Sequence, residues 1–189
     1  MLTLIMVTCL VASAPSQDAA AGQETPSGAT AVSPDDTRFV DQLSGEIGRF
    51  DVTNWVMSGP GDVRELHFVV VTEVVLGGAG VRTVWRTAPD GDFFGELTRS
   101  LDPQTGEVVQ HWYAARSGSW SQTRQIVQFD ASGHGTSFSG EDGYGPFEAR
   151  TRTMRTDDGG YRWTIERRYP GTDWFLIDRG EAVPASDGG

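Results

Sequence analysis

The chain has 189 residues, enough for one domain of ordinary size with a well-buried core and too few for two unless both are small. Its 15 basic residues are all Arg and its acidic residues number 26, so the formal net charge is -11. This excess of negative charge disfavours nucleic-acid phosphates and anionic lipid headgroups as partners. The absence of Lys also excludes Schiff-base chemistry through a Lys side chain.

The N-terminal residues have the pattern of an export signal. An apolar run over residues 2–12 is followed by Ala12-Ser13-Ala14, a small-x-small sequence typical of signal-peptidase cleavage. The run is too short for a permanent membrane helix, so the sequence predicts a signal peptide over 1–14, no integral membrane span and a secreted or periplasmic protein. Basic residues are missing before the run, which leaves open a true start upstream of Met1.

The only cysteine, Cys9, lies inside this predicted signal. Val7-Thr8-Cys9 loosely resembles a lipobox, so the alternative to cleavage is a lipoprotein anchored through an acylated Cys9. If the signal is removed, the mature protein has no disulfide, no thiolate nucleophile and no Cys metal ligand.

Residues 15–34 are mainly Ala, Ser, Gly, Gln, Thr and Pro, a composition that predicts a disordered linker. A single folded domain is expected over 35–184, followed by a disordered tail over 185–189. This domain should open with a short helix, because Ser33 or Asp35 can cap it and Ser44-Gly45 can end it. The apolar face of that helix would hold Phe39, Val40 and Leu43.

Strand-length apolar runs follow one another from Gly45 onward, separated by Gly, Pro and Asp turns. Short turns force antiparallel pairing between sequence neighbours, and a long meander removes its edges by closing. We therefore predict an all-β fold, an antiparallel up-and-down barrel of about ten strands with one short N-terminal helix. A two-sheet sandwich is the alternative. The expected strands are 46–56, 64–76, 80–87, 92–101, 107–115, 120–130, 135–141, 147–156, 160–169 and 174–183.

Alternation within the strands predicts which side chains point inward. Tyr161, Trp163, Ile165 and Tyr169 share one face of their strand and form the expected core. On the strand before, Glu148, Arg150 and Arg152 share a face that we expect to be solvated, with cross-strand ion pairs to Glu166.

One hairpin, Leu97 to Tyr113, is expected to be rigid because its turn reads Asp-Pro-Gln-Thr-Gly. Asp102 can accept hydrogen bonds from turn amides, and Gly106 can adopt the left-handed conformation that rejoins the next strand. Such a turn fixes the register, so Leu97, Arg99 and Leu101 share one face and Val108, Gln110 and Trp112 share one.

No motif for catalysis or metal binding emerges from the sequence. It contains no G-x-S-x-G turn, and its three histidines lack the spacing of a metal site, so neither a metal nor a cofactor is predicted. His134 is expected in a turn and His111 on the surface. Glu141 and Asp142 are adjacent on a strand and therefore face opposite ways, which argues against a catalytic carboxylate pair.

The aromatic inventory is the remaining functional signal. Six Trp residues in a chain of this size can fill a barrel or line a pocket for one apolar ligand. Arg99 shares a face with apolar residues, so it either snorkels at the barrel mouth or is buried and paired. The candidate ligand-binding residues are Arg99, Trp112, Trp85, Trp163 and Trp174.

Three stretches carry a resemblance to a known family. They are Leu76-Gly77-Gly78 followed by Val84-Trp85-Arg86, the hairpin from Phe94 to Trp112, and the closing strands from Gly133 to Trp174. In these the chain resembles the bacterial domain-of-unknown-function 1579 family over roughly Phe39 to Val183. The resemblance implies a lipocalin-like (calycin) β-barrel and assigns no reaction. Leu101 and Val108 depart from the family pattern where aromatic residues are usual, and Pro170-Gly171-Thr172-Asp173 replaces its D-G-G turn.

Three hypotheses for function follow from a barrel, its aromatics and an export signal. The first is a binding module for a small hydrophobic or amphipathic ligand, as a monomer or a dimer. The second is a barrel enzyme, such as an isomerase, hydratase or cyclase, which would need a buried carboxylate or His with a shifted pKa. The third is an envelope protein-interaction module, which an exposed apolar patch would favour.

Overall fold

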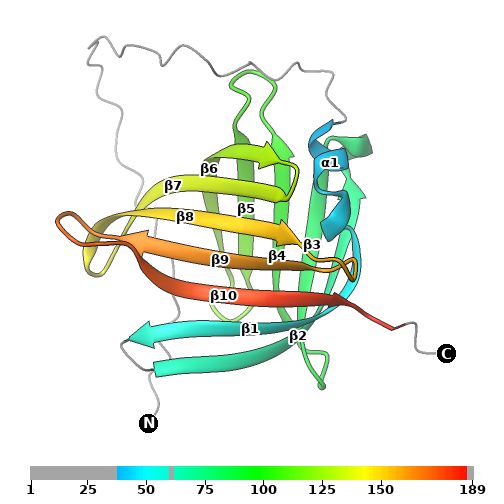
Figure 1. The fold of residues 1–189 in the computed structure, drawn as a ribbon, viewed down its shortest axis with the longest axis horizontal. Coiled ribbons are helices and arrows are strands. Elements are labelled where there is room, and N and C mark those ends of the chain that lie inside the picture. The colour runs from blue at the N-terminus through cyan, green and yellow to red at the C-terminus, as the bar shows by residue number, and fades with distance from the viewer. Residues whose placement is uncertain (1–37, 60–61, 187–189) are drawn as a thin grey trace.

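The computed structural model describes residues 38–59 and 62–186. Each strand pairs antiparallel with its sequence neighbours, and β1 pairs with β10 to close the barrel (Figure 1). The predicted all-β up-and-down barrel is therefore confirmed, and the sandwich alternative is wrong. The predicted signal peptide, the linker and most of the tail lie outside the described residues. The strands are β1 Gly48–Gly59, β2 Asp62–Val75, β3 Gly80–Thr87, β4 Phe93–Leu101, β5 Val108–Ala114, β6 Ser119–Asp130, β7 Gly133–Asp142, β8 Gly145–Arg155, β9 Tyr161–Arg168 and β10 Phe175–Pro184.

One end of the barrel is closed by the helix α1, Arg38–Gln42, and the 3-10 turn η1, Ser44–Glu46 (Figure 1). The predicted apolar face of the helix is buried, and Leu43 is only 2% exposed. It packs against Val81 of β3 and Val108 of β5 in one hydrophobic cluster. The helix therefore seals this end with apolar contacts. Among the described residues, no helix has the length and apolar character needed to cross a bilayer.

His134 corrects one expectation. The turn before it is tighter than predicted, because the Asp130 carboxylate accepts hydrogen bonds from the backbone N–H groups of Ser132 (2.8 Å) and Gly133 (3.1 Å). β7 therefore starts at Gly133, and His134 lies in a strand rather than a turn. Its side chain faces inward and is buried.

The burial of the inward side chains differs between the two walls of the barrel. Along β1 to β3 the inward side chains, such as Phe50, Phe68 and Val70, form a compact buried cluster. Along β4 to β8 several inward side chains remain partly exposed, whereas Gln125 and Ala149 on the same wall are buried, so water reaches part of the inside of the barrel here. The partly exposed side chains include Leu97, Gln110, Trp112, Thr123, Thr136 and Thr151.

β6 and β7 separate along most of their length. Their pairing runs only from Asp130↔Gly133 to Ile126↔Ser137. Beyond this, residues Ser119–Gln125 of β6 and Phe138–Asp142 of β7 continue as strands but are not paired with each other. The closed barrel therefore has a side opening in its hydrogen-bonding pattern between these two strands.

Candidate ligand-binding site

A chain of aromatic rings crosses the inside of the barrel from β9 to β5. Trp163 of β9 and Trp85 of β3 meet edge to face, with ring centroids 6.0 Å apart and planes at 88°. The Trp85 ring contacts Phe68 at 5.4 Å, and Phe68 contacts Phe94 at 4.8 Å. Phe94 in turn contacts Trp112 at 6.3 Å. Three of the predicted site residues, Trp85, Trp112 and Trp163, thus belong to one inner aromatic cluster.

Glycines in neighbouring strands make room for two of these rings. Trp163 pairs with Gly180 of β10, and a Cβ built at Gly180 would lie 2.0 Å from Cζ2 of Trp163. A Cβ at Gly95 of β4 would lie 2.6 Å from the Trp112 ring. Because each ring lies across a bare backbone, its position is fixed by the strand beneath it.

The Trp163 ring also orients a partly buried carboxyl group. Its indole N–H donates to Oδ1 of Asp178 at 2.8 Å, and the side-chain amide of Asn54 donates to the same oxygen at 2.9 Å. Asn54 is held in turn by a second bond from its amide to the backbone carbonyl of Arg179 at 2.9 Å. Asp178 therefore has one oxygen with two neutral donors and a fixed orientation.

The second oxygen of Asp178, Oδ2, makes no hydrogen bond to any described residue, and it is not one of the unpartnered polar atoms buried from water. Burial of the side chain raises the pKa of Asp178 to about 6, against the opposing effect of the two hydrogen bonds. Asp178 is thus an acid on the inside of the barrel that titrates at about pH 6 and has an oxygen open to a small molecule.

Arg99 occupies the closed end, where it resolves the two alternatives left by the sequence. Its guanidinium donates to Oε2 of Glu46 at 2.7 Å, and each side chain is 12% exposed. His134 lies 3.4 Å from the other oxygen of Glu46, and burial lowers the pKa of this histidine. Arg99 is therefore buried and paired beneath α1, away from the Asp178 carboxyl.

Trp174 does not join the inner cluster. The guanidinium groups of Arg150 and Arg168 lie over its ring at 4.4 and 4.8 Å. Both Arg residues belong to the outer face, where Arg150 pairs with Glu166 at 2.6 Å as the sequence predicts. A bulge in β10 explains the placement, because it inserts one extra residue between Leu176 and Asp178. Asp178 therefore faces inward while Leu176 faces outward, and Trp174, two positions before Leu176, lies on the outer side as well.

A second buried ion pair lies at the end of the barrel opposite α1. Arg167 of β9 pairs with Asp142 of β7, and the hydroxyl of Tyr169 donates to the same Asp142 oxygen at 2.8 Å. The Arg167 guanidinium stacks on the ring of Phe147 at 3.9 Å. Glu141 is exposed while Asp142 points inward, as expected for adjacent strand residues. The opposite charges of Arg167 and Asp142 neutralise each other, and the contacts of these residues link β7, β8 and β9.

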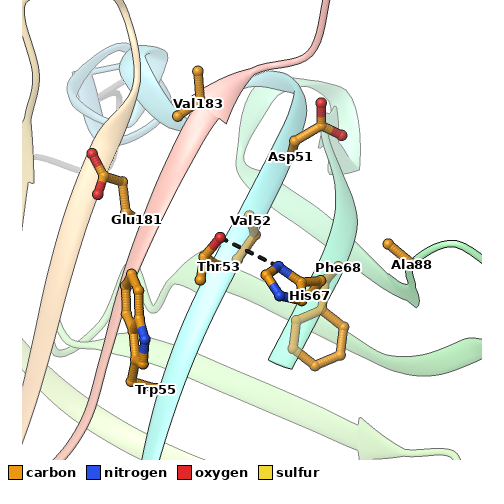
Figure 2. Close-up of a pocket in the computed structure, with 9 residues that line it drawn as sticks. All are labelled: Asp51, Val52, Thr53, Trp55, His67, Phe68, Ala88, Glu181 and Val183. Atoms are coloured by element: carbon orange, nitrogen blue, oxygen red, sulfur yellow. Dashed lines mark hydrogen bonds between the residues drawn. The ribbon is translucent and has the colours of Figure 1, made fainter. Parts of the chain in front are cut away.

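A shallow depression of about 350 Å³ lies on the outer wall of β10, β1 and β2 (Figure 2). Most of its polar side chains already have partners: Trp55 donates to Glu65 at 2.9 Å, and His67 contacts Glu65 at 3.1 Å and Thr53 at 3.4 Å. Glu181 accepts a hydrogen bond from Arg162 at 2.7 Å. Arg179 covers the Trp55 ring at 5.0 Å. Because most of its polar groups already have partners on the chain, few of them remain for a ligand.

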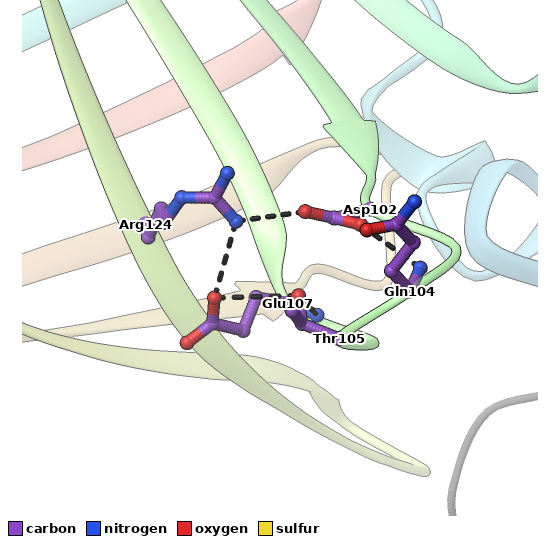
Figure 3. A network of polar contacts seen from close by, with 5 residues as sticks. All are labelled: Asp102, Gln104, Thr105, Glu107 and Arg124. Atoms are coloured by element: carbon purple, nitrogen blue, oxygen red, sulfur yellow. Dashed lines mark hydrogen bonds and ion pairs between the residues drawn. The ribbon is translucent and has the colours of Figure 1, made fainter.

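The hairpin between β4 and β5 is a scaffold element, as predicted. Asp102 accepts a hydrogen bond from the backbone N–H of Gln104 at 2.9 Å, and Gly106 has a φ of 72°. Arg124 of β6 braces the turn from outside by contacting Asp102 at 2.8 Å and Glu107 at 3.3 Å (Figure 3). The turn thereby fixes the register that sets Trp112 inside the barrel.

Sequence reasoning missed Asp178, Asn54 and Arg167. Arg167 carried a signal, because it alternates with Trp163 and Ile165 on the face predicted to be core. Asn54 and Asp178 carried none, since their partnership spans 124 positions and depends on the β10 bulge. Within the described ranges there is no group of three or more His, Cys, Asp or Glu residues that could hold a metal ion.

No protein-family model matches this chain, and no match to a curated protein was found.

Proposed function

We propose that this protein is an exported barrel that binds a small hydrophobic or amphipathic molecule against the inner cluster of Trp85, Trp112 and Trp163. The observation that carries the proposal is a partly water-accessible inner wall that combines these rings with the open oxygen of Asp178. Ligand pockets in proteins have this character, with apolar and aromatic walls and few orienting polar groups. The apolar sequence over residues 2–12 supports export.

The two ends of the barrel limit where a ligand would lie. α1 fills the end nearest Arg99 and the Arg167–Asp142 pair lies at the other, so a ligand would lie between them, against the aromatic cluster. The unpaired stretch between β6 and β7 supports a lateral route to the same space. The lipocalin-like character of the domain-of-unknown-function 1579 family, to which we propose the chain belongs, is in keeping with such binding.

The test is retention of a ligand by the purified protein. We expect native mass spectrometry after incubation with a lipid extract to show a bound species, and Trp85→Leu to weaken its retention. Trp55→Leu is the matched control, because Trp55 lies on the outer wall. Retention lost in Trp55→Leu but kept in Trp85→Leu would place binding in the outer depression and overturn the proposal, as would a protein that retains nothing.

A second candidate function is favoured by one observation, the partly buried acid whose pKa lies at about 6. An acid of this kind is suited to proton transfer at neutral pH, so a barrel enzyme would use Asp178 as its general base. Its test is solvent deuterium exchange at the α′-carbon (C6) of cyclohexenone, followed by NMR. Catalysed exchange that rises through about pH 6 and is lost in Asp178→Asn would support the enzyme; an exchange rate equal to that of buffer would exclude this reaction.

A further inference from the structure

We infer that the ligand carries a cationic nitrogen, as in a lipophilic amine, and that this group pairs with Asp178. The inference rests on the proposed function, because it requires that the inner face takes a ligand. It concerns the chemistry of the ligand, which the proposed function leaves open. A fatty acid or another anion is the competing class.

The carboxyl groups of the inner face differ in their partners. Glu46 at the closed end is paired with Arg99, and Asp142 at the opposite end is paired with Arg167. Asp178 lies between them along the barrel and has no salt bridge to any described residue. Two of the three carboxyl groups thus have a cation supplied by the chain, and the third has only neutral donors.

The geometry at Asp178 leaves room for that missing cation. Trp163 and Asn54 both donate to Oδ1, which leaves the lone pairs of Oδ2 for another donor. A protonated amine supplies a charge-assisted hydrogen bond, about twice as strong as a neutral one. A ligand carboxylate at the same place would instead face the negative charge of Asp178.

The rings around Asp178 favour the same class of ligand. Trp163 lies against the carboxyl group, and Trp85 meets Trp163 at 6.0 Å. Trp163 turns its N–H edge to the carboxyl group, so the rings supply apolar contact area and Asp178 supplies the attraction for a positive charge. A carboxylate beside tryptophan rings therefore matches a head with positive charge and an apolar body.

Two Arg residues face the inside of the barrel near Asp178. Val56 of β1 pairs with Asp178 on one side and with Arg64 of β2 on the other. Asp178 itself pairs with Ile165 of β9, and Arg167 lies two residues further along that strand. Neither is among the causes of the raised pKa of Asp178, which are burial and the two hydrogen bonds. Neither Arg is bonded to Asp178, so the open oxygen is not already neutralised by them.

The experiment compares three probes of equal chain length, namely decylamine, decanol and decanoate, by quenching of intrinsic tryptophan fluorescence. At about pH 7.5 Asp178 is ionised, and we expect decylamine to bind about tenfold or more tightly than decanol, with decanoate weakest. The preference for the amine should fall as the pH drops below about 6, because protonation removes the charge of Asp178.

The isosteric variant Asp178→Asn separates this inference from a general attraction of an acidic protein for amines. It should abolish the preference for decylamine over decanol and leave decanol binding unchanged within about twofold. The matched control is Asp173→Asn, an exposed acid outside the barrel interior, which should keep the wild-type order.

The outcomes distinguish the two proposals. If none of the three probes binds, the proposed function fails and the inference fails with it. If decanol or decanoate binds as tightly as decylamine, or if Asp178→Asn keeps the preference, the interior takes ligands and only the inference about the cationic head is overturned. Circular dichroism of each variant establishes that the barrel is folded before binding is compared.

Discussion

The indole N–H of Trp163 and the carboxyl group of Asp178 meet at 2.8 Å across neighbouring strands, and the Trp163 ring reaches this position only because residue 180 has no Cβ. Ring, glycine and acid therefore form one unit, in which the backbone of β10 positions the indole and the indole positions the carboxyl. A substitution at any one of these three residues should therefore alter the positions of the other two.

The first prediction concerns Gly180→Ala. The new methyl group would lie 2.0 Å from Cζ2 of Trp163, so the ring must move and its hydrogen bond to Asp178 must break. We expect the free energy of unfolding to fall by about 1–3 kcal/mol, measured by urea denaturation. Gly143→Ala is the control, because nothing lies within 4 Å of a Cβ built there. Equal stability of the two variants would show that Trp163 is not held by the bare backbone.

The second prediction concerns the pH dependence of stability through Asp178. Its pKa is about 6 in the folded chain against an ordinary value of 3.8, so the folded state holds this proton more tightly than the unfolded state does. The stabilisation is therefore fully present below about pH 4 and is lost as the pH rises through about 6. The difference in pKa corresponds to at most ~3 kcal/mol.

Asp178→Asn removes this titration while keeping the shape of the side chain. Denaturant unfolding of both proteins at about pH 4 and about pH 7.5 should show the variant gaining about 2–3 kcal/mol relative to wild type at the higher pH. Other carboxyl groups cancel in this comparison because both proteins contain them. A difference between the two proteins that does not change with pH would contradict the raised pKa.

The third prediction concerns the buried pair beneath α1. Glu46→Gln leaves the guanidinium of Arg99 buried without its carboxylate, so we expect a loss of about 3 kcal/mol in the free energy of unfolding. Glu73→Gln removes an exposed partner of Arg82 and should cost less than about 1 kcal/mol. The double variant Glu46→Leu with Arg99→Met should recover most of the loss, since no charge is then left unpaired. Additive losses in the double variant would argue against a coupled pair.

The fourth prediction concerns the separation of β6 and β7. Residues Ser119–Gln125 and Phe138–Asp142 pair with β5 and β8 on one side only. Because amides alternate in direction along a strand, every second N–H in these stretches points to the opening and should exchange rapidly with deuterium. Amides of Ile126 to Asp130 that bond across to β7 should be protected. Uniform protection measured by NMR along β6 would mean that the two strands close in solution.

The barrel itself could be predicted from the sequence because its rules are local. Alternation of apolar residues marks a strand, and turns such as the one at Asp102 force neighbours to pair. The same alternation correctly placed Tyr161 and Trp163 in the core. The helical spacing of Phe39, Val40 and Leu43 indicated the short helix in the same local way.

The site could not be predicted because its contacts are not local. Asn54 and Asp178 are 124 residues apart and become neighbours only when β1 closes against β10. The bulge next to Asp178 also reverses the alternation, which is why Trp174 lies outside although simple counting places it on the same face as Asp178. His134 was misplaced for a similar reason, because a carboxylate-capped turn moved the start of its strand.

The perpendicular contact of Trp85 and Trp163, 6.0 Å between ring centres, has a spectroscopic consequence. Two indoles this close share their excited states, so their coupled transitions should add a signed pair of bands to the circular dichroism spectrum that neither ring produces alone. The bands depend on the angle between the rings, here 88°. A molecule that enters beside Asp178 and tilts Trp163 would change these bands. Ligand binding can therefore be followed by circular dichroism without a dye or label.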